Sequence, residues 1–237
     1  MHKLHLSTRL KEDQKHGVGA FNVTELLVVV ACLSILAAII LPTLARQGQG
    51  CQRINGTNNL KQIGLCFRTW ALDNNDKFPM QVSITNGGAM EAVITGAVFR
   101  VFQVMSNELS TPKILFCPQE KDRKRIAADS FGIGSGTSHS IHFTNDNNLS
   151  YFAGLDAEDI FPGRLLSGDR NLAVGGRPVS HGVLNLWTND GVTWSKALHK
   201  NQGNIALADG SVQQVISPRL RILFAQSGIA TNRLAIP

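Results

Sequence analysis

A long apolar stretch near the start of the chain dominates its pattern of hydrophobic and polar positions. Residues 26–45 contain no charged side chain. At 1.5 Å per residue, a helix of this length spans roughly 30 Å, the thickness of a bilayer's hydrocarbon core. The preceding residues, 1–20, are polar with an excess of basic side chains, which favours their retention on the cytoplasmic side. The pattern predicts one membrane helix, with the rest of the chain across the membrane.

Two ordinary interpretations of this segment leave features unexplained. A secretory signal peptide has an apolar region of about 7 to 15 residues followed by a cleavage site, so this run is too long and its leader too extended. A plain signal anchor fits the length and the charge. It does not explain why Glu25, the only charged side chain between residues 21 and 45, lies immediately before the apolar run.

A second helical pattern follows the membrane segment. Apolar residues recur at helical spacing over residues 58–71, which predicts an amphipathic helix packed against a sheet and ending before the turn formers at 73–76. Gly48, Gly50 and Gly56 lie between the two helical patterns, and each lowers helix propensity by up to about 1 kcal/mol. A weakened or bent helix is expected there. The residues on the buried face are Leu60, Ile63, Phe67 and Trp70.

The rest of the chain alternates short apolar segments with turn formers, which predicts a β-rich globular domain. Residues 92–109 have apolar positions near one stripe and are expected to form a core helix. Residues 114–118 are expected to form a short strand, and residues 119–149 a long surface loop. Further strand and turn segments are expected at residues 150–152 and 166–171.

The distribution of charge and the absence of known catalytic motifs argue against several functions. A net charge of +6 would permit contact with nucleic acid or anionic lipid, but the basic residues are scattered. Their densest cluster, residues 121–125, is interpreted as a solvated loop, with a binding patch as the alternative. The glycines of residues 132–136 lack the Lys-Ser/Thr ending of a phosphate loop. Because the basic residues are scattered, we expect no specific nucleic-acid partner. The sequence has no G-x-S-x-G or H-E-x-x-H motif, so we expect no catalytic residue and no enzyme activity.

Four cysteines, at positions 32, 51, 66 and 117, include no C-x-x-C pair, which argues against a zinc ribbon or a thioredoxin-like motif. Cys32 falls inside the apolar run and is interpreted as a small hydrophobic residue. The others are expected beyond the membrane, where an oxidising compartment could join two of them. Cys51 and Cys66 would be roughly 22 Å apart along a continuous helix, beyond disulfide reach. Any bridge is therefore expected to involve Cys117.

The start of the apolar run resembles a known processing site. Residues 19–30 read Gly-Ala-Phe-Asn-Val-Thr-Glu-Leu-Leu-Val-Val-Val and closely resemble the cleavage and methylation segment of type IV prepilins and type II secretion pseudopilins. The resemblance implies that a prepilin peptidase cuts before Phe21, methylates the new amino terminus and leaves Glu25 four residues later. The family usually has glycine before the phenylalanine, whereas this chain has Ala20. A cut after Ala20 is expected, and a cut after Gly19 stays open.

Pro42 falls where many members of that family carry a helix-kinking proline. Proline lacks an N–H and clashes with the carbonyl four residues earlier, so it bends or locally melts a helix. Within a membrane, neighbouring helices can satisfy the freed groups. Pro42 is therefore assigned, with Glu25, to assembly. The alternative is that it merely ends the membrane helix.

A second resemblance comes from the C-terminal part of the chain. His199 and Asp209-Gly210 form an H-x9-D-G pattern. Together with residues 59–62 and 117–118, this pattern is similar to that of the large pilin-like families of Planctomycetes and Verrucomicrobia.

The H-x9-D-G pattern has two interpretations. Asp209-Gly210 between two short apolar runs is a hairpin signal, and a type I′ turn with positive φ at both central residues is expected. Alternatively, His199 and Asp209, with Asp169, form a metal or substrate site. One histidine with dispersed carboxylates is not a convincing metal set, so no metal ligand is predicted. No cofactor is expected, and calcium is the alternative, because similar major pseudopilins bind it in a C-terminal loop, although their ligands do not map residue by residue onto this chain.

Together these patterns predict a pilin-like α+β fold, in which a long N-terminal helix packs on an antiparallel β-sheet domain. The expected divisions are a leader (1–20), a membrane and assembly helix (21–45), its amphipathic continuation (46–72) and an extracytoplasmic β-rich domain (73–237).

The resemblance implies a structural subunit of a type IV pilus or a type II secretion-like filament. It would cross the inner membrane once, with the leader cytoplasmic and the C-terminal domain periplasmic or at the cell surface. Its expected partners are prepilin peptidase, other pilin-like subunits contacted through the N-terminal helix, an assembly platform and ATPase, and the membrane. The alternative is a monomeric, membrane-tethered surface domain that binds polysaccharide or another ligand.

Overall fold

The structure is a computed structural model that describes residues 22–132 and 140–237, without the side chains of residues 41–53. The chain divides into two compact units, Met1–Gln47 and Gly48–Pro237. Helix α1 (Val23–Leu72) stays helical through the glycines that were expected to weaken or bend it. Glycine lowers helix propensity but keeps its backbone N–H, so these glycines do not end the helix.

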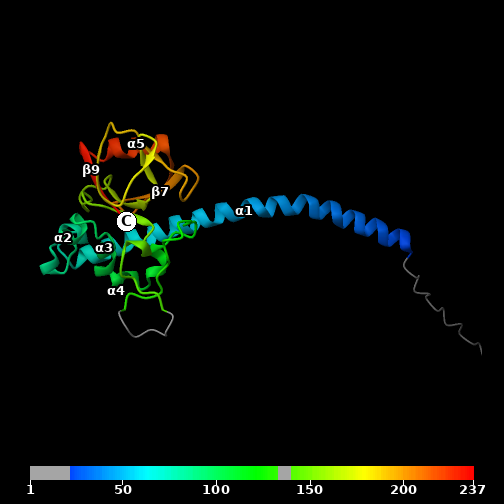
Figure 1. Cartoon of the computed structure of the whole chain (residues 1–237), viewed down its shortest axis with the longest axis horizontal. Coiled ribbons are helices and arrows are strands. Elements are labelled where there is room, and N and C mark those ends of the chain that lie inside the picture. Colours follow the sequence, from blue (N-terminus) through cyan, green and yellow to red (C-terminus); the bar gives the residue numbers. More distant parts are fainter. Residues whose placement is uncertain (1–21, 133–139) are drawn as a thin grey trace, which may run out of the picture. The chain divides into compact units, whose positions relative to one another are not determined.

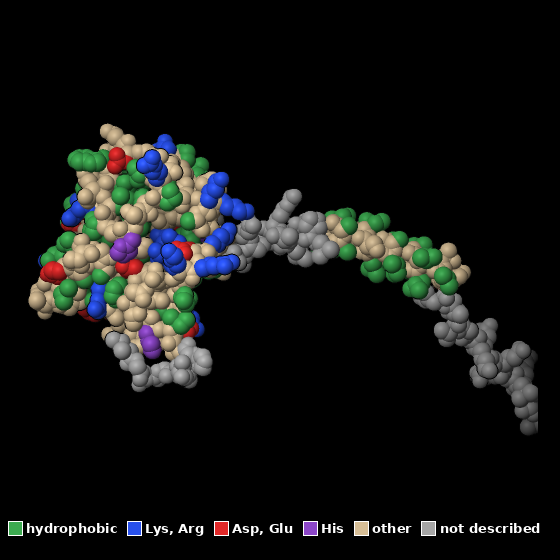
Figure 2. All heavy atoms as spheres, viewed as in Figure 1, with side chains coloured by type: hydrophobic (Ala, Val, Ile, Leu, Met, Phe, Trp, Pro, Cys, Tyr) green, Lys and Arg blue, Asp and Glu red, His purple; other side chains and the backbone are tan. Residues whose placement is uncertain are grey.

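The first unit exposes an apolar helical surface. All side chains at residues 22–40 are exposed, and Figure 2 shows hydrophobic side chains covering this part of α1. Among the described residues, Val23–Ile40 is the one helical stretch long and apolar enough to cross a membrane. Its 18 residues span about 27 Å at 1.5 Å each, close to the thickness of a hydrocarbon core.

The second half of α1 lies in the core of the globular unit. Leu60, Ile63 and Phe67 are fully buried and Trp70 is nearly so, which confirms the predicted apolar face. Phe67 packs edge-on against Phe78, with ring centroids 5.7 Å apart. This face shares one hydrophobic core with residues of the main sheet, as predicted.

Short helices follow α1 where one longer helix was predicted over residues 92–109. Val93 and Val101 are buried as expected, but the helix is divided, because Gly96 adopts a left-handed φ of +99° that an α-helix does not accommodate. The pieces are α2 (Met90–Ile94), α3 (Phe99–Val104) and α4 (Ser106–Leu109), preceded by the 3₁₀ turns η1 (Pro79–Gln81) and η2 (Ile84–Asn86).

The predicted strand over residues 114–118 is wrong. The chain instead forms the 3₁₀ turn η3 (Pro112–Leu115), which the Thr111 hydroxyl caps by accepting a hydrogen bond from the Lys113 N–H. Proline suits the first position of such a turn, because the N–H it lacks would have no partner there. The turn leads into Cys117, which is fully buried.

The described residues of the predicted surface loop, 119–132 and 140–149, include one helical turn, η4 (Asp146–Asn148), and none of the strands of the two sheets. The surface position is wrong in part, because Ala128, Phe143 and Leu149 are fully buried in the core. Residues 121–124 are exposed, in agreement with a solvated loop. Arg125 differs from them, because its guanidinium is partly buried and donates to the Leu149 carbonyl. The loop is therefore fastened to the core at this residue.

The main sheet has six antiparallel strands in the order β5-β9-β1-β2-β7-β8. Its residues alternate between two cores: Tyr151 and Ala153 face the core shared with α1, and Phe152 faces the core shared with α5 (Ser217–Gln226). Figure 1 shows α5 on one side of the globular unit and α2 to α4 on the other. A second sheet has the order β4-β3-β6. The strands are β1 (Tyr151–Gly154), β2 (Leu165–Asp169), β3 (Leu172–Val174), β4 (Arg177–Pro178), β5 (Gly182–Trp187), β6 (Val192–Trp194), β7 (Gln202–Leu207), β8 (Val212–Ile216) and β9 (Thr231–Ile236).

The predicted α+β class is confirmed, with an antiparallel sheet and one apolar N-terminal helix. The strands predicted near residues 150–152 and 166–171 are β1 and β2.

Candidate functional site

Three buried side chains from distant parts of the chain meet at one point in the globular unit. The Sγ of Cys117 lies 3.5 Å from the Nε2 of His199, and the same nitrogen lies 3.2 Å from the Oδ2 of Asp169. One ligand atom from each residue falls within 4.8 Å of the other two. Cys117 and Asp169 are 0% exposed and His199 is 5% exposed.

The fold positions each member of this cluster differently. Cys117 follows η3, and Asp169 ends β2, where it pairs with Tyr151 of β1. His199 precedes β7, and the chain turns into that strand through Lys200 and Asn201, which adopt left-handed φ values of 52° and 65°. The cluster therefore joins the loop after η3 to two neighbouring strands of the sheet.

Amide groups hold the imidazole and the carboxylate in place. The Oε1 of Gln119 lies 2.7 Å from the Nδ1 of His199. Asn204 donates to the Oδ2 of Asp169 from its backbone N–H at 2.7 Å and from its side-chain amide at 3.0 Å. The Oδ1 of Asp169 is buried and has no hydrogen-bond partner. Thr57 on α1 donates to the Oδ1 of Asn204 at 3.2 Å, so α1 supports the same network.

Burial and charge shift the pKa values of the neighbouring groups. Burial, followed by the charge of Asp169, raises the pKa of Cys117 to about 12. Burial, with Cys117 and Asp169 nearby, also raises the pKa of Tyr151 well above its usual range. Both groups are protonated at neutral pH without a further cation in the site.

The geometry does not support nucleophilic catalysis. In a catalytic triad the nucleophile and the orienting acid contact opposite nitrogens of the histidine, whereas Cys117 and Asp169 both approach Nε2 of His199. The thiol is also fully buried and strongly protonated. Sulfur, imidazole nitrogen and carboxylate oxygen are instead the ligand types of zinc sites. They do not suit calcium, which takes oxygen ligands.

The other residues of the H-x9-D-G pattern have a separate role. The predicted hairpin is present between β7 and β8, but the expected type I′ turn is wrong, because Gly210 has a left-handed φ of +83° and Asp209 does not. The N–H of Gly210 donates to the Leu207 carbonyl at 2.9 Å. The Oδ1 of Asp209 accepts from the Ser211 N–H at 2.8 Å. The loop therefore has one residue more than a type I′ turn. Only its last residue, Gly210, needs a positive φ, as in a G1 bulge.

The sequence-predicted pair of His199 and Asp209 is therefore not a shared site. Asp209 is exposed and partners Ser211, whereas His199 is buried with Asp169, the residue named as a third candidate.

The structure places the N-terminal site residues only in part. Gly19, Ala20 and Phe21 lie outside the described residues. Glu25 is exposed in the first turn of α1, and its Oε2 accepts a hydrogen bond from the Asn22 N–H at 3.2 Å. Pro42 lies within the helical span of α1, and its side chain is outside the described part.

The described cysteines form no disulfide. Cys66 and Cys117 are both free and buried, and the side chain of Cys51 lies outside the described part. Cys117 contacts His199 instead of another sulfur. Burial, followed by the charge of Glu108, raises the pKa of Cys66 to about 11.

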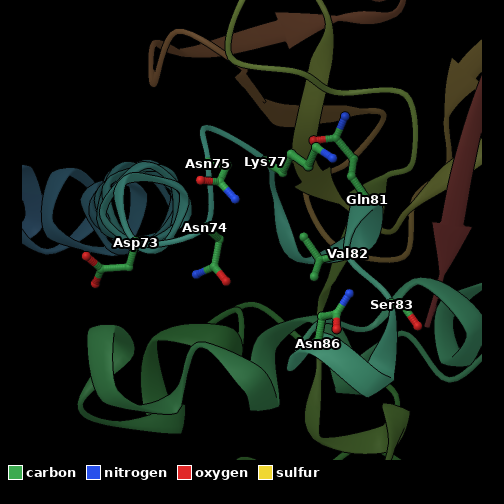
Figure 3. Close-up of a pocket in the computed structure, with 8 residues that line it drawn as sticks. All are labelled: Asp73, Asn74, Asn75, Lys77, Gln81, Val82, Ser83 and Asn86. Carbon is green, nitrogen blue, oxygen red and sulfur yellow. The ribbon is translucent and has the colours of Figure 1, made fainter.

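A polar hollow beside the end of α1 is a weaker candidate site. Figure 3 shows its lining, in which the carboxylate of Asp73 and the ammonium of Lys77 point in different directions. A binding site needs polar groups that converge on a ligand, so this hollow carries no assignment. Its other lining residues are Asn74, Asn75, Gln81, Val82, Ser83 and Asn86.

No protein-family model, curated protein or solved structure matches this chain.

Proposed function

We propose that the protein is a membrane-anchored structural subunit of a pilus or a type II secretion-like filament. Prepilin peptidase removes residues 1–20, and the helix that follows holds the subunit in the inner membrane, with the globular domain outside the cytoplasm. An assembly ATPase and platform then bring subunits together through this helix. The proposal rests on the resemblance of residues 19–30 to prepilin cleavage segments.

One observation carries the proposal furthest. The carboxylate of Glu25 turns back toward the start of α1, where it accepts a hydrogen bond from the Asn22 N–H. Cleavage before Phe21 would place a new ammonium group one residue from this N–H. We therefore expect the carboxylate to pair with the charge that processing creates, in the same subunit or in a neighbour.

The surrounding surface explains why such a pair would matter. Residues 22–40 expose large apolar side chains, which lipid or other apolar helices can cover. Apolar contact alone tolerates sliding of one helix along another. An ionisable side chain in a membrane segment costs free energy, so its presence points to a function. Leaving it unpaired among packed helices would raise that cost. Pairing of Glu25 with the Phe21 ammonium would favour one axial register over others.

The experiment replaces Glu25 in cells that express the processed protein. Glu25→Ala and Glu25→Gln are expected to leave membrane insertion and leader removal intact and to abolish sheared filaments and crosslinked multimers. Glutamine keeps the size and hydrogen-bonding capacity, so its failure would assign the effect to charge. Ser34→Ala is the matched control, because Ser34 is a polar residue in the same exposed stretch whose hydroxyl is bonded to its own helix, at Val30.

Multimers of Glu25→Ala at wild-type levels would overturn the register hypothesis. A wild-type chain that stays monomeric in the membrane while binding polysaccharide would favour a tethered surface domain instead.

A further inference from the structure

We propose that Cys117, Asp169 and His199 bind one zinc-type divalent metal ion in the globular unit. Two of the three distances between ligand atoms match a tetrahedral site, and the third is at most 4.8 Å. Zinc bonds of about 2.3 Å to sulfur and about 2.1 Å to nitrogen or oxygen put sulfur about 3.6 Å from nitrogen, and nitrogen about 3.4 Å from oxygen. The Sγ of Cys117 is 3.5 Å from the Nε2 of His199, which is 3.2 Å from the Oδ2 of Asp169.

The hydrogen bonds leave electron pairs directed into the cluster. The Oε1 of Gln119 can only accept, so the Nδ1 of His199 carries the proton in their 2.7 Å contact. In neutral imidazole the Nε2 of His199 then presents a lone pair toward Cys117 and Asp169. The Oδ1 of Asp169 is buried without any partner. A cation between the three groups would take the lone pair of Nε2 and the Oδ2 of Asp169, and it would satisfy the unpaired Oδ1 as well if Asp169 bound through both oxygens.

The second layer of contacts is also that of a metal site. Ligating histidines donate their other N–H to an acceptor, and ligating carboxylates accept hydrogen bonds of their own. Gln119 supplies the first contact and Asn204 the second. Gly56 of α1 closes the site, because a Cβ there would lie 3.2 Å from the Nδ2 of Asn204 and 3.9 Å from the Nε2 of His199.

The ligand types and the burial identify the metal class and its role. Thiolate and imidazole select zinc over calcium and magnesium, which prefer all-oxygen sites. The three residues are at most 5% exposed, so a bound ion would be structural rather than catalytic. It would clamp the loop after η3 to the ends of β2 and β7. Three protein ligands leave one position for a water molecule or the second oxygen of Asp169.

The test uses the full, untagged chain in detergent, stripped with a chelator and then given ZnCl₂ or CoCl₂. Wild type is expected to retain about one equivalent of metal after dialysis and to melt at a higher temperature with zinc than without it. Cobalt is expected to give a thiolate-to-metal charge-transfer band and the intense visible bands of a tetrahedral ion. A folded wild-type chain that retains no metal and shows no such band would overturn the proposal and leave a buried imidazole–carboxylate contact.

Three variants locate the ion. Cys117→Ser is expected to lose the charge-transfer band, whereas Cys66→Ser, which changes the other described buried thiol, is expected to keep it. Gln119→Ala is expected to keep the band and weaken zinc binding by about 10- to 100-fold, because it frees the imidazole to reorient. Loss of the band in Cys66→Ser with retention in Cys117→Ser would contradict the assignment.

A second measurement covers the case in which Cys117→Ser does not fold. X-ray absorption of the zinc-loaded wild type is expected to show one sulfur and otherwise nitrogen or oxygen ligands. A shell without sulfur would overturn the proposal.

Discussion

Arg170 and Glu120 form a two-point ion pair beside the buried cluster, with Nε donating to Oε2 at 2.9 Å and Nη2 donating to Oε1 at 2.7 Å. The Glu120 side chain is 1% exposed and that of Arg170 is 15% exposed. Burial alone would raise the pKa of Glu120. The hydrogen bonds and charge of Arg170, with the Asp122 N–H and the Ser150 hydroxyl, outweigh it and leave the pKa below its usual value.

This pair predicts a pH-dependent loss of stability. Because the pKa of Glu120 is lower in the folded than in the unfolded chain, its carboxylate stabilises the fold above the unfolded pKa of about 4.3. That stability declines as the pH falls from there through the folded pKa. Glu120→Gln is expected to lower the free energy of unfolding by about 3 kcal/mol at pH 7, and by progressively less below about pH 4.3. Chemical unfolding of the full chain in detergent at several pH values measures this difference.

The control for Glu120 is the exposed pair of Arg68 and Asp159, whose atoms are 3.7 Å apart with side chains 49% and 34% exposed. Asp159→Asn is expected to change stability by less than about 0.5 kcal/mol. An effect of Glu120→Gln that is constant between pH 7 and pH 3 would show that shape, not charge, is responsible.

Gly210 is required for its backbone conformation. Its φ of +83° is in the left-handed region, and an added Cβ would meet nothing closer than the Cδ of Arg68 at 3.6 Å. Gly210→Ala is therefore expected to cost about 1 kcal/mol through backbone strain alone. Gly191→Ala is the matched control, because a Cβ there enters open space without a left-handed φ. Equal melting temperatures for the two variants would refute this explanation.

Asp209→Ala separates the turn from the buried cluster. It removes the acceptor of the Ser211 N–H, so the hairpin is expected to lose about 1 kcal/mol of stability. Zinc retention by the folded variant should equal that of wild type, because Asp209 is not among the cluster's ligands. A variant that melts like wild type but no longer holds a ligand would instead place Asp209 in a site.

The sequence predicts elements whose signal is local. The apolar face from Leu60 to Trp70 follows helical spacing, and the β7–β8 hairpin follows from Asp209-Gly210. The predictions of secondary structure are wrong where an apolar pattern competes with a local glycine or proline. Residues 92–109 have a helical stripe, but Gly96 adopts positive φ, and the apolar residues 114–118 follow a capped proline turn instead of pairing with a strand.

The buried cluster is only partly visible in the sequence. The H-x9-D-G pattern selects His199, and Asp169 is a candidate companion in the sequence. Cys117, 82 residues from His199, carries only the cysteine-proline resemblance, and a contact over that distance depends on the folded chain. Asn204 is one of two polar residues in β7, with Gln202, so its position alone does not single it out, and nothing in the sequence marks Gln119 as a partner of the imidazole.

The central claim is that the chain is a processed pilin-like subunit, and mass spectrometry of its amino-terminal peptide from cells tests this most directly. The account predicts a mature chain that begins at Phe21 with a methylated amino group, formed by cleavage after Ala20. Cells without prepilin peptidase should retain the leader. An intact Met1 in normal cells, or a chain that begins near Arg46 as a secretory peptidase would leave it, would contradict the account.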